Sequence, residues 1–501
     1  MLSLIVFLPL AAAAVLAAVP ASAGKRVFTG SWVVVSAVDL ALVVAAWIGY
    51  APGMGLAYEQ RLPWIPSAGV SYHVGVDGLS LPLVAVTAVL FLACAVHSLR
   101  QTHRVKSFAL LFLFLQTVSL GLFTALDLIL FFVYFDLSIV GMYFVIARWG
   151  HGNARRSALT FFLYTFLGSL ALLLGFIGLS LAAEPHTFDI VELARADPLA
   201  GSGARGALVL LAIGVGLAVK TPTVPFHTWL PPAHTDAPAA GSAILAGVLL
   251  KMGTYGFVRI AMPLLPAVWR QYAAVVVVLG VVSVLYGALV ALAQEDFKRM
   301  VAYTSVNHMG YIVLAVGAAG LAAGSDEQAR SLAVTGAVTQ MISHGLLTGA
   351  LFLLAGVLHD RAASYDMGSY SGLATTAPAF AGVTGLVVFA SLGLPGFSGF
   401  IAEFQIFTGS LVSATIATAL ALLGILITAG LLLRALHRVF LGALRVPGSP
   451  GAAHDFTDLK PSETVSIMPL LALAIVIGVL PRFLLDVIEP SAATLIGVVS
   501  S

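Results

Sequence analysis

Residues 214–259 read GVGLAVKTPTVPFHTWLPPAHTDAPAAGSAILAGVLLKMGTYGFVR, and they place one lysine near the middle of each of two long apolar segments. These lysines are Lys220 and Lys251. A charged side chain at the centre of a bilayer costs roughly 3 kcal/mol even on lenient insertion scales, so chains keep such groups facing a protein interior or a wet cavity. The stretch therefore predicts two membrane spans that each hold a functional cation.

The composition of the whole chain indicates a polytopic membrane protein. Of its 501 residues, 60% are hydrophobic and only 9% are Asp, Glu, Lys or Arg, whereas about 25% of an ordinary soluble domain is charged. The net charge of +2 is too small to indicate nucleic-acid binding. The single cysteine, Cys94, excludes an internal disulfide, a cysteine-ligated iron–sulfur cluster and a structural zinc site.

The apolar runs are continuous and about 20 residues long, as transmembrane helices are. We therefore predict an all-α fold with about fourteen spans, the first of them a retained helix and not a cleaved signal. They cover 2–20, 31–50, 78–98, 107–125, 127–147, 157–182, 206–229, 238–261, 271–293, 300–320, 329–358, 374–410, 414–440 and 464–487. The eleventh and twelfth exceed one bilayer crossing, which predicts a tilt or a break in each.

The distribution of Lys and Arg in the loops predicts the orientation, because cytoplasmic loops are enriched in these residues. Fifteen bases fall on one predicted face: Lys25, Arg26, Arg100, Arg104, Lys106, Arg148, Arg155, Arg156, Lys298, Arg299, Arg361, Arg434, Arg438, Arg445 and Lys460. Seven fall on the other: Arg61, Arg195, Arg205, Arg259, Arg270, Arg330 and Arg482. We expect the first face to be cytoplasmic, which puts both termini on the outer side.

Ionisable side chains recur inside six of the predicted spans. They are Asp136, Lys220, Lys251, His308, His344 and Glu403 in the fifth, seventh, eighth, tenth, eleventh and twelfth spans. All but His308, which lies nearer the cytoplasmic end of its span, have similar depth, so they predict a polar line in the membrane plane. Two simpler alternatives stay open: single lysines or histidines satisfied by helix packing, and a static ion pair between Asp136 and Lys220.

Two of these spans contain helix-breaking residues. Pro222 and Pro225 follow Lys220, and Gly393, Pro395 and Gly396 precede Glu403. A proline has no N–H and frees the carbonyl four residues earlier, which predicts unpaired acceptors at Ala218 and Thr221. Interrupted spans in corresponding places of two halves are typical of transporters with a midplane ion site.

The positions of the breaks predict an internal repeat. The seventh and twelfth spans are each fourth in a block of five, so spans 4–8 and 9–13 form two inverted repeats, with Lys220 and Glu403 pseudo-equivalent. The predicted domains are 1–106 (helices 1–3), 107–261 (first repeat), 271–440 (second repeat) and 441–501 (a loop and the last helix).

Several motifs carry a resemblance to a known family. Besides 220–259 they are GVDGLSLPL (75–83), YTSVNHMGYIVL (303–314), QMISHGLLTGALFLLAGVLHDR (340–361) and GLPGFSGFIAEF (393–404). The chain resembles the antiporter-like proton-pumping subunits of bacterial respiratory complex I, the NADH–quinone oxidoreductase, over nearly its whole length. It is most similar to the subunit M (chain 4) branch, because Glu403 stands where subunits L and N are expected to carry lysine.

The resemblance implies a role for each residue of the polar line. In this family an acid on the fifth helix pairs with a lysine on the broken seventh, and the second lysine, the histidines and the last acid continue the proton path. These positions correspond to Asp136, Lys220, Lys251, His308, His344 and Glu403. The family's acid on the fifth helix is usually glutamate, so the shorter Asp136 puts its distance to Lys220 in question.

The resemblance also implies partners and a location. No cofactor is expected in this chain, which lacks a Walker A motif, a GxGxxG nucleotide site and cysteine ligands. NADH, FMN, iron–sulfur clusters and quinone are expected in partner subunits, with subunits L and N as membrane neighbours in a bacterial inner membrane. Moving a proton outward costs about 2.3 kcal/mol per 100 mV, and partner subunits must supply that energy.

Two other functions stay open from the sequence alone. One is a subunit of a cation/proton antiporter or of a membrane-bound hydrogenase, which share the superfamily motifs. The other is a haem or copper oxidase core, since the chain holds twelve histidines. These histidines are scattered and several lie in loops, which favours the proton-pumping subunit.

Overall fold

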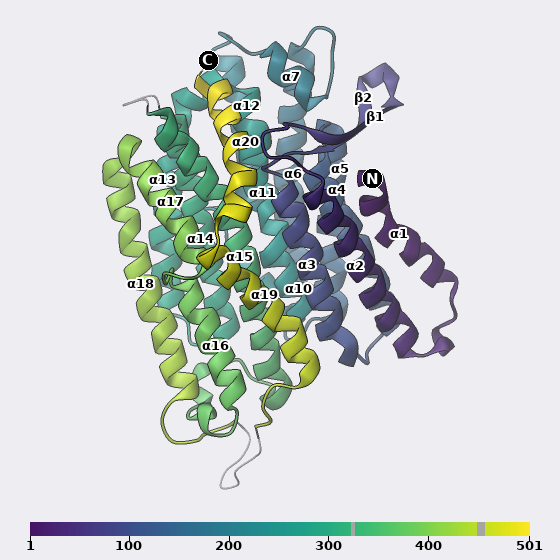
Figure 1. Ribbon diagram of the computed structural model, residues 1–501, viewed down its shortest axis with the longest axis vertical. Coiled ribbons are helices and arrows are strands. Elements are labelled where there is room, and N and C mark those ends of the chain that lie inside the picture. The colour runs from purple at the N-terminus through teal and green to yellow at the C-terminus, as the bar shows by residue number, and fades with distance from the viewer. Residues whose placement is uncertain (322–325, 448–455, 501) are drawn as a thin grey trace.

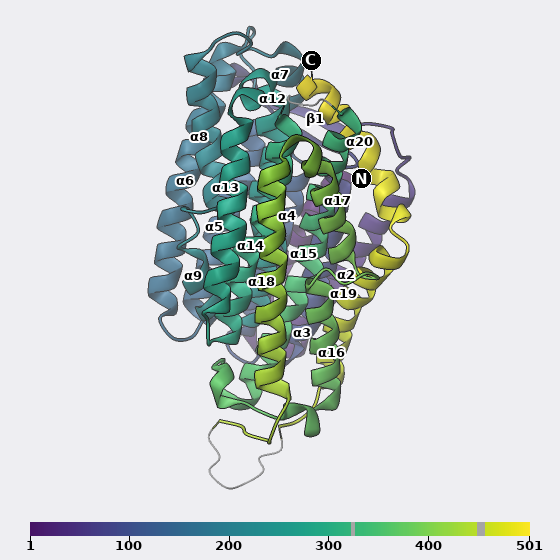
Figure 2. The ribbon, with the colours of Figure 1, turned by 90° about the vertical axis from the view of Figure 1, so that its left-hand side faces the viewer.

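The computed structural model describes residues 1–321, 326–447 and 456–500. Long helices run side by side through the height of the molecule (Figures 1 and 2). In the described part of the chain, eleven helices are long and apolar enough to cross a membrane. The longest is α15 (Glu327–Ala362), which lies inside the bundle and is buried throughout its most apolar 18-residue window. The polytopic helical architecture is thus confirmed.

The N-terminal half of the bundle follows the predicted spans closely. Its helices are α1 (Leu2–Ala18), α2 (Lys25–Ile48), α3 (Leu81–His97), α4 (Val105–Thr124), α5 (Leu128–Trp149), α6 (Ala154–Ala182), the short α7 (Ile190–Ala196) and α8 (Ala204–Lys220). Asp127 caps α5 by accepting hydrogen bonds from the backbone N–H groups of Ile129 and Leu130, as an N-cap aspartate does.

The remaining helices begin after the break that follows Lys220. They are α9 (Leu230–Asp236), α10 (Ala239–Ile244), α11 (Leu250–Gly256), α12 (Met262–Leu264), α13 (Pro266–Leu292), α14 (Phe297–Gly320), α15, α16 (Pro378–Ser391), α17 (Ser398–Ser413), α18 (Thr415–Phe440), α19 (Pro461–Val479) and α20 (Arg482–Ser500). Two π-helical turns, Leu245–Leu249 and Phe257–Ala261, join α10, α11 and α12 into one rod.

The all-α prediction is wrong in the loop between α2 and α3. There β1 (Ala57–Ile65) and β2 (Val70–Val76) form an antiparallel hairpin, with Leu62 opposite Tyr72. The hairpin lies over the ends of helices, where His73 O accepts from Leu126 N. A search for apolar runs misses such strands because they are short and partly polar.

The predicted spans differ from the structure at the long helices. The eleventh span is one continuous helix, α15, whereas the twelfth is broken at 392–397 between α16 and α17. The predicted span 464–487 is wrong in its bounds, since α19 ends at Val479 and α20 runs from Arg482 to Ser500. Pro481 lies between them and cannot donate a backbone hydrogen bond, which explains the interruption. The two helices meet partway along the bundle (Figure 1).

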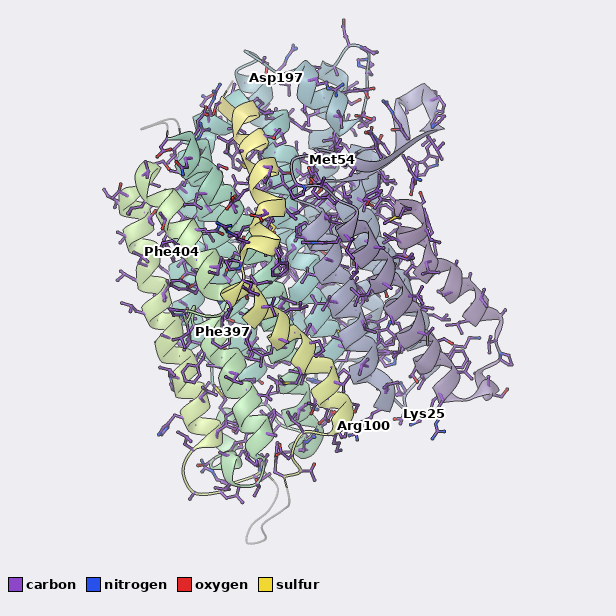
Figure 3. All side chains as sticks on the ribbon, in the orientation of Figure 1. Lys25, Met54, Arg100, Asp197, Phe397 and Phe404 are labelled. Atoms are coloured by element: carbon purple, nitrogen blue, oxygen red, sulfur yellow. The ribbon has the colours of Figure 1, made fainter. Side chains whose placement is uncertain are left out.

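Residues of the base-rich face and the β-hairpin lie at opposite ends of the bundle. Lys25 and Arg100, both assigned to the base-rich face, lie toward the same end in Figure 3, and Asp197 lies at the opposite end. The hairpin and α7 are at the Asp197 end (Figure 1). The start of the chain lies beside the hairpin, because Ser3 Oγ donates to Gln60 Oε1 at 2.5 Å.

Candidate functional site

Lys220 is the last residue of α8 and its side chain is only 1% exposed. Its Nζ donates to Ser138 Oγ of α5 at 2.9 Å and lies 4.7 Å from the centre of the Phe135 ring. Among the described residues, no nitrogen–oxygen pair within 4.0 Å joins Lys220 to Asp136. The direct ion pair that the family resemblance implied is therefore replaced by a contact with a serine hydroxyl.

Asp136 lies two residues before that serine on the same helix. It is partly buried, and its Oδ1 is buried without a hydrogen-bond partner among the described residues. Residues two apart on a helix do not face each other, so a lysine bound to Ser138 does not form a direct ion pair with Asp136, although the two charges are close enough to interact. The carboxyl group of Asp136 is left to act on Lys220 through space or through water.

At the break after Lys220, backbone carbonyl oxygens that lose their helical hydrogen bonds find new donors. Ala218 O accepts from both Thr223 N (3.1 Å) and Thr223 Oγ1 (3.3 Å). The prediction that Ala218 is an unpaired acceptor is therefore wrong, because the chain turns back and supplies new donors. Val219 O also accepts from Trp229 Nε1 at 3.0 Å, which holds the turn against the end of α8.

Lys251 sits on α11, between the two π-helical turns. π-helical turns occur often at functional sites because they re-aim side chains and carbonyls. The helix approaches the break of α8 closely, since a methyl group at Gly253 would overlap Thr221. Thr221 Oγ1 is buried there without a partner among the described residues. The two lysine-bearing helices thus meet at a small residue and an unpaired hydroxyl.

Lys251 directly contacts His344, the next residue along the predicted polar line. Its Nζ lies 2.6 Å from His344 Nδ1 of α15 and donates to Ala246 O at 2.5 Å. An ammonium group has only donors, so a charged Lys251 requires the lone pair of His344 Nδ1. His344 Nε2 is then left protonated, and it has no partner among the described residues.

The line continues from α15 to α14 and α17. The rings of His344 and His308 stand edge to face with their centres 5.4 Å apart. His308 Nδ1 lies 3.1 Å from Gln340 Nε2 and 3.9 Å from Glu403 Oε1. Lys251, His344, His308 and Glu403 therefore form one connected buried set across four helices.

Glu403 lies against the glycine of the second break. Gly393 has φ +70°, which favours glycine, and a methyl group there would overlap Glu403 Oε2. A cavity of about 400 Å³ between α17 and α18 reaches Glu403 and Phe404. Phe404 is 57% exposed at the surface of the bundle. The second break thus brings a carboxyl group near the lipid-facing or partner-facing surface.

Sequence reasoning missed several polar side chains of this region. Ser138 and Gln340 bind Lys220 and His308, and Thr221 lies between the lysine-bearing helices. His234 of α9 is fully buried, stacks on Phe352 at 4.5 Å, and has no hydrogen-bond partner for either ring nitrogen among the described residues. Its place directly after the break of the seventh span was the one signal that could have identified it.

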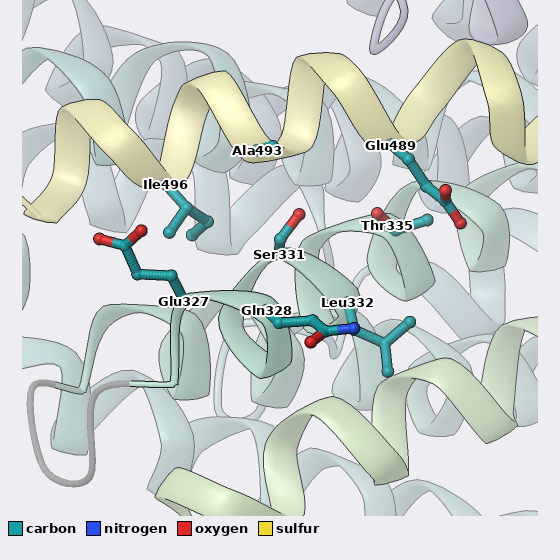
Figure 4. Close-up of a pocket in the computed structure, with 8 residues that line it drawn as sticks. All are labelled: Glu327, Gln328, Ser331, Leu332, Thr335, Glu489, Ala493 and Ile496. Atoms are coloured by element: carbon teal, nitrogen blue, oxygen red, sulfur yellow. The ribbon is translucent and has the colours of Figure 1, made fainter.

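Another large cavity lies apart from the line. It has a volume of about 390 Å³ and opens between α15 and α20, with Glu327, Ser331 and Glu489 in its wall (Figure 4). None of the six residues of the line contributes to it. In the ranges that the structure describes, no group of three or more His, Cys, Asp or Glu could hold a metal ion.

Comparisons with known proteins agree with the geometry. Residues 125–428 match the family described as the transmembrane region of NADH:quinone oxidoreductase and Mrp antiporters. The chain is 37% identical to the NADH-quinone oxidoreductase subunit M of Rhodobacter capsulatus, over 99% of this chain and 96% of that protein. It is 38% identical to the subunit M of Rickettsia conorii, over 88% and 86%.

Solved structures show the same fold. A chain of respiratory complex I from Thermus thermophilus with bound NADH is 30% identical and aligns with a TM-score of 0.86 over 99% of this chain and all of that one. A chain of the Mrp complex from a Dietzia species has a TM-score of 0.85 over 100% and 99% at 22% identity, which shows a shared fold alone. The protein therefore belongs to the family of NADH:quinone oxidoreductase and Mrp antiporter membrane subunits.

Proposed function

We propose that this chain is the subunit M of a bacterial NADH–quinone oxidoreductase and that it moves protons across the membrane along the line from Asp136 to Glu403. The observation that carries the proposal is the buried contact series Lys251–His344–His308–Glu403, which links four helices. The family relationship supplies the type of complex. A static packing role is disfavoured, because four titratable groups are buried together with several nitrogen and hydroxyl atoms that have no partner in the described part of the chain.

The chemistry of the line suits proton transfer between fixed side chains. A charged Lys251 passes a proton along its hydrogen bond to His344, and an imidazole that gains a proton on one nitrogen can release another from the opposite nitrogen. His308 and Glu403 continue the series, and the cavity beside Glu403 leaves space next to its carboxyl group. Groups this close titrate as a coupled set, so a charge change at one end shifts proton occupancy at the other.

The arrangement of the chain in its complex follows from the same relationship. Two inverted five-helix repeats, within about fourteen spans and the domains 1–106, 107–261, 271–440 and 441–501, would make the two breaks symmetry-related. NADH, FMN, the iron–sulfur clusters and quinone would belong to partner subunits, with subunits L and N as membrane neighbours. The base-rich face that includes Lys25 and Arg100 would be cytoplasmic, with both termini outside the bacterial inner membrane.

Purification and reconstitution of the assembled complex test this function. A tagged chain should copurify with flavin- and iron–sulfur-containing partners, and NADH should drive acidification of vesicles with quinone present. Lys251→Ala should remove most of the acidification per NADH oxidised, whereas Lys25→Ala, on an exposed lysine, should not. Copurification with Mrp-type partners and sodium–proton exchange without NADH would instead favour the antiporter alternative.

A further inference from the structure

A buried carboxyl group on α2 lies outside the line from Asp136 to Glu403. Asp39 is 0% exposed and is the fifteenth of the 24 residues of α2, which puts it about 21 Å from the Lys25 end of the helix at 1.5 Å per residue. No salt bridge between described residues involves Asp39. The helix therefore carries an acid near the middle of the membrane without a counter-charge.

Asp39 is held by a polar triad that joins α2 to α4. Gln116 Nε2 donates to Asp39 Oδ2 at 2.6 Å, and Ser36 Oγ donates to Gln116 Oε1 at 2.8 Å. All three side chains are fully buried, and Asp39 Oδ1 has no partner among the described residues. The triad thus satisfies one carboxyl oxygen and leaves the other free to carry a proton.

The triad can accommodate Asp39 both with and without a proton. A glutamine amide has a donor end and an acceptor end, and a serine hydroxyl can donate or accept. In the observed orientation of Gln116, the Oδ2 of an ionised Asp39 accepts a hydrogen bond from the side-chain N–H of Gln116. When the proton is on Oδ1, the neutral acid still accepts from the same N–H at its carbonyl oxygen Oδ2, while Gln116 Oε1 keeps the hydrogen bond from Ser36. Gln116 therefore keeps its hydrogen bonds whether Asp39 is ionised or protonated.

The buried face of α2 is polar on one side of Asp39 only. Toward Lys25 it carries Ser36, Trp32 and Thr29, at the three- and four-residue spacing of one helix face. The Nε1 of Trp32 is buried without a partner among the described residues. In the other direction the buried face continues with Val43 and Ala46. The polar side chains of this face therefore lie on the Lys25 side of Asp39 and not on the hairpin side.

We propose that Asp39, Gln116 and Ser36 form a proton-binding site in the N-terminal helices, which exchanges its proton with the face of the protein that carries Lys25. The carboxylate of Asp39 binds one proton to give the neutral acid, and no other reactant is needed. Neutralisation removes the large cost of an unpaired charge in hydrocarbon. The site does not depend on the proposed function of the line, because none of the six line residues takes part in it.

Infrared spectroscopy of the full chain in lipid nanodiscs tests the site directly. Carboxyl-labelled aspartate, with carbon-13 in the side chain, separates the aspartate bands from those of glutamate. At neutral pH the wild type minus Asp39→Asn difference should contain the carbonyl band of a protonated acid, and this band should shift in D₂O. Asp486→Asn removes an exposed acid and should change only carboxylate bands. Only carboxylate bands in the Asp39→Asn difference, or an acid band that does not exchange, would overturn the proposal.

Substitutions around Asp39 test the triad and the direction of exchange without removing the acid. Gln116→Leu should move the acid band to higher frequency, because the carbonyl loses its hydrogen bond, at an unchanged yield of folded chain. The double variant Thr29→Val/Trp32→Phe should slow deuterium exchange of the band several-fold, whereas Val43→Ala should not. Slower exchange in Val43→Ala alone, or an unmoved band in Gln116→Leu, would contradict the assigned route and partner.

Discussion

Lys251 Nζ and His344 Nδ1 lie 2.6 Å apart, the closest approach of two titratable groups along the line. They come from α11 and α15, which meet where α11 is flanked by π-helical turns. A contact this short between an amine and an imidazole fixes the direction of the hydrogen bond, because a charged lysine can only donate. Transfer of a proton across this contact needs no large movement of either side chain.

Replacing His344 by glutamine should therefore separate hydrogen bonding from proton exchange. Glutamine can accept from Lys251 through its amide oxygen but cannot take up and pass on a proton. We expect His344→Gln to lower NADH-driven vesicle acidification at least about tenfold, since a positioned proton-transfer group typically contributes about 10²–10⁴-fold, with near-normal amounts of assembled complex. His103→Gln, at an exposed histidine, is the matched control. Normal pumping by His344→Gln would mean that the imidazole only packs.

Ser138 gives a second test, at the other lysine. Because Lys220 Nζ donates to Ser138 Oγ, Ser138→Ala leaves a buried ammonium without that acceptor, at a cost of about 1–3 kcal/mol. We expect Ser138→Ala to lower pumping and Ser138→Thr to retain it, as measured by acidification of vesicles per NADH oxidised. Asp136→Glu should be nearly neutral, since it only lengthens the acid. Equal activity of the Ala and Thr variants would exclude a role for the hydroxyl.

The contact between Lys220 and Ser138 is a feature that the sequence could not predict. Apolar runs predicted the helices, and a lysine within such a run predicted a polar interior. The family pattern then implied Asp136 as its direct partner, but positions 136 and 138 lie on different sides of α5, and the direct contact of Lys220 is with Ser138. Which of the two faces the lysine depends on the rotation of α5 in the bundle, and this rotation is set by packing and not by composition.

The hairpin and α20 escaped the same reasoning for different physical reasons. β1 and β2 mix polar and apolar residues over a short loop segment, so they resemble neither a span nor a featureless loop. α20 contains Arg482, Asp486 and Glu489 in a single helix, and these charges hide its apolar face from a search for long apolar runs. Both elements are recognised only when the surface that they cover is known.

The hairpin carries a pH-dependent contact outside the membrane spans. His73 is buried, with Nδ1 2.6 Å from Asp189 Oδ2 and Nε2 2.9 Å from Glu59 Oε1. Burial acts to lower the pKa of His73, but the hydrogen bonds to Asp189 and Glu59 raise it above its ordinary value overall. Nearby charges on the other packed elements are those of Arg61, Glu192 and Asp127.

The stability of the hairpin should therefore fall as pH rises. A pKa raised in the folded state gives stability that is fully present below the unfolded value, about 6.5, and lost as pH passes the folded pKa. We expect amide hydrogen exchange in 70–76, corrected for the intrinsic pH dependence, to show less protection at alkaline pH in the wild type. In His73→Gln this pH dependence should disappear, while His103→Gln should keep it. Unchanged wild-type protection across this range would contradict the charged His73.

The last prediction concerns the contact between Gly393 and Glu403. Gly393→Ala would place a methyl group on Glu403 Oε2 and force a side chain into a backbone with φ +70°, which typically costs about 1 kcal/mol or more. We expect the carboxyl group to be displaced from His308 and pumping to fall strongly, to a level similar to that of Glu403→Gln. Gly385→Ala on α16, where a methyl group would meet no atom within 4 Å, should leave pumping and assembly unchanged. Vesicle acidification per NADH oxidised, together with the amount of assembled complex, distinguishes a displaced carboxyl group from a misfolded helix. If Gly393→Ala pumps normally while Glu403→Gln does not, the contact of Glu403 with Gly393 is not needed for its role in pumping.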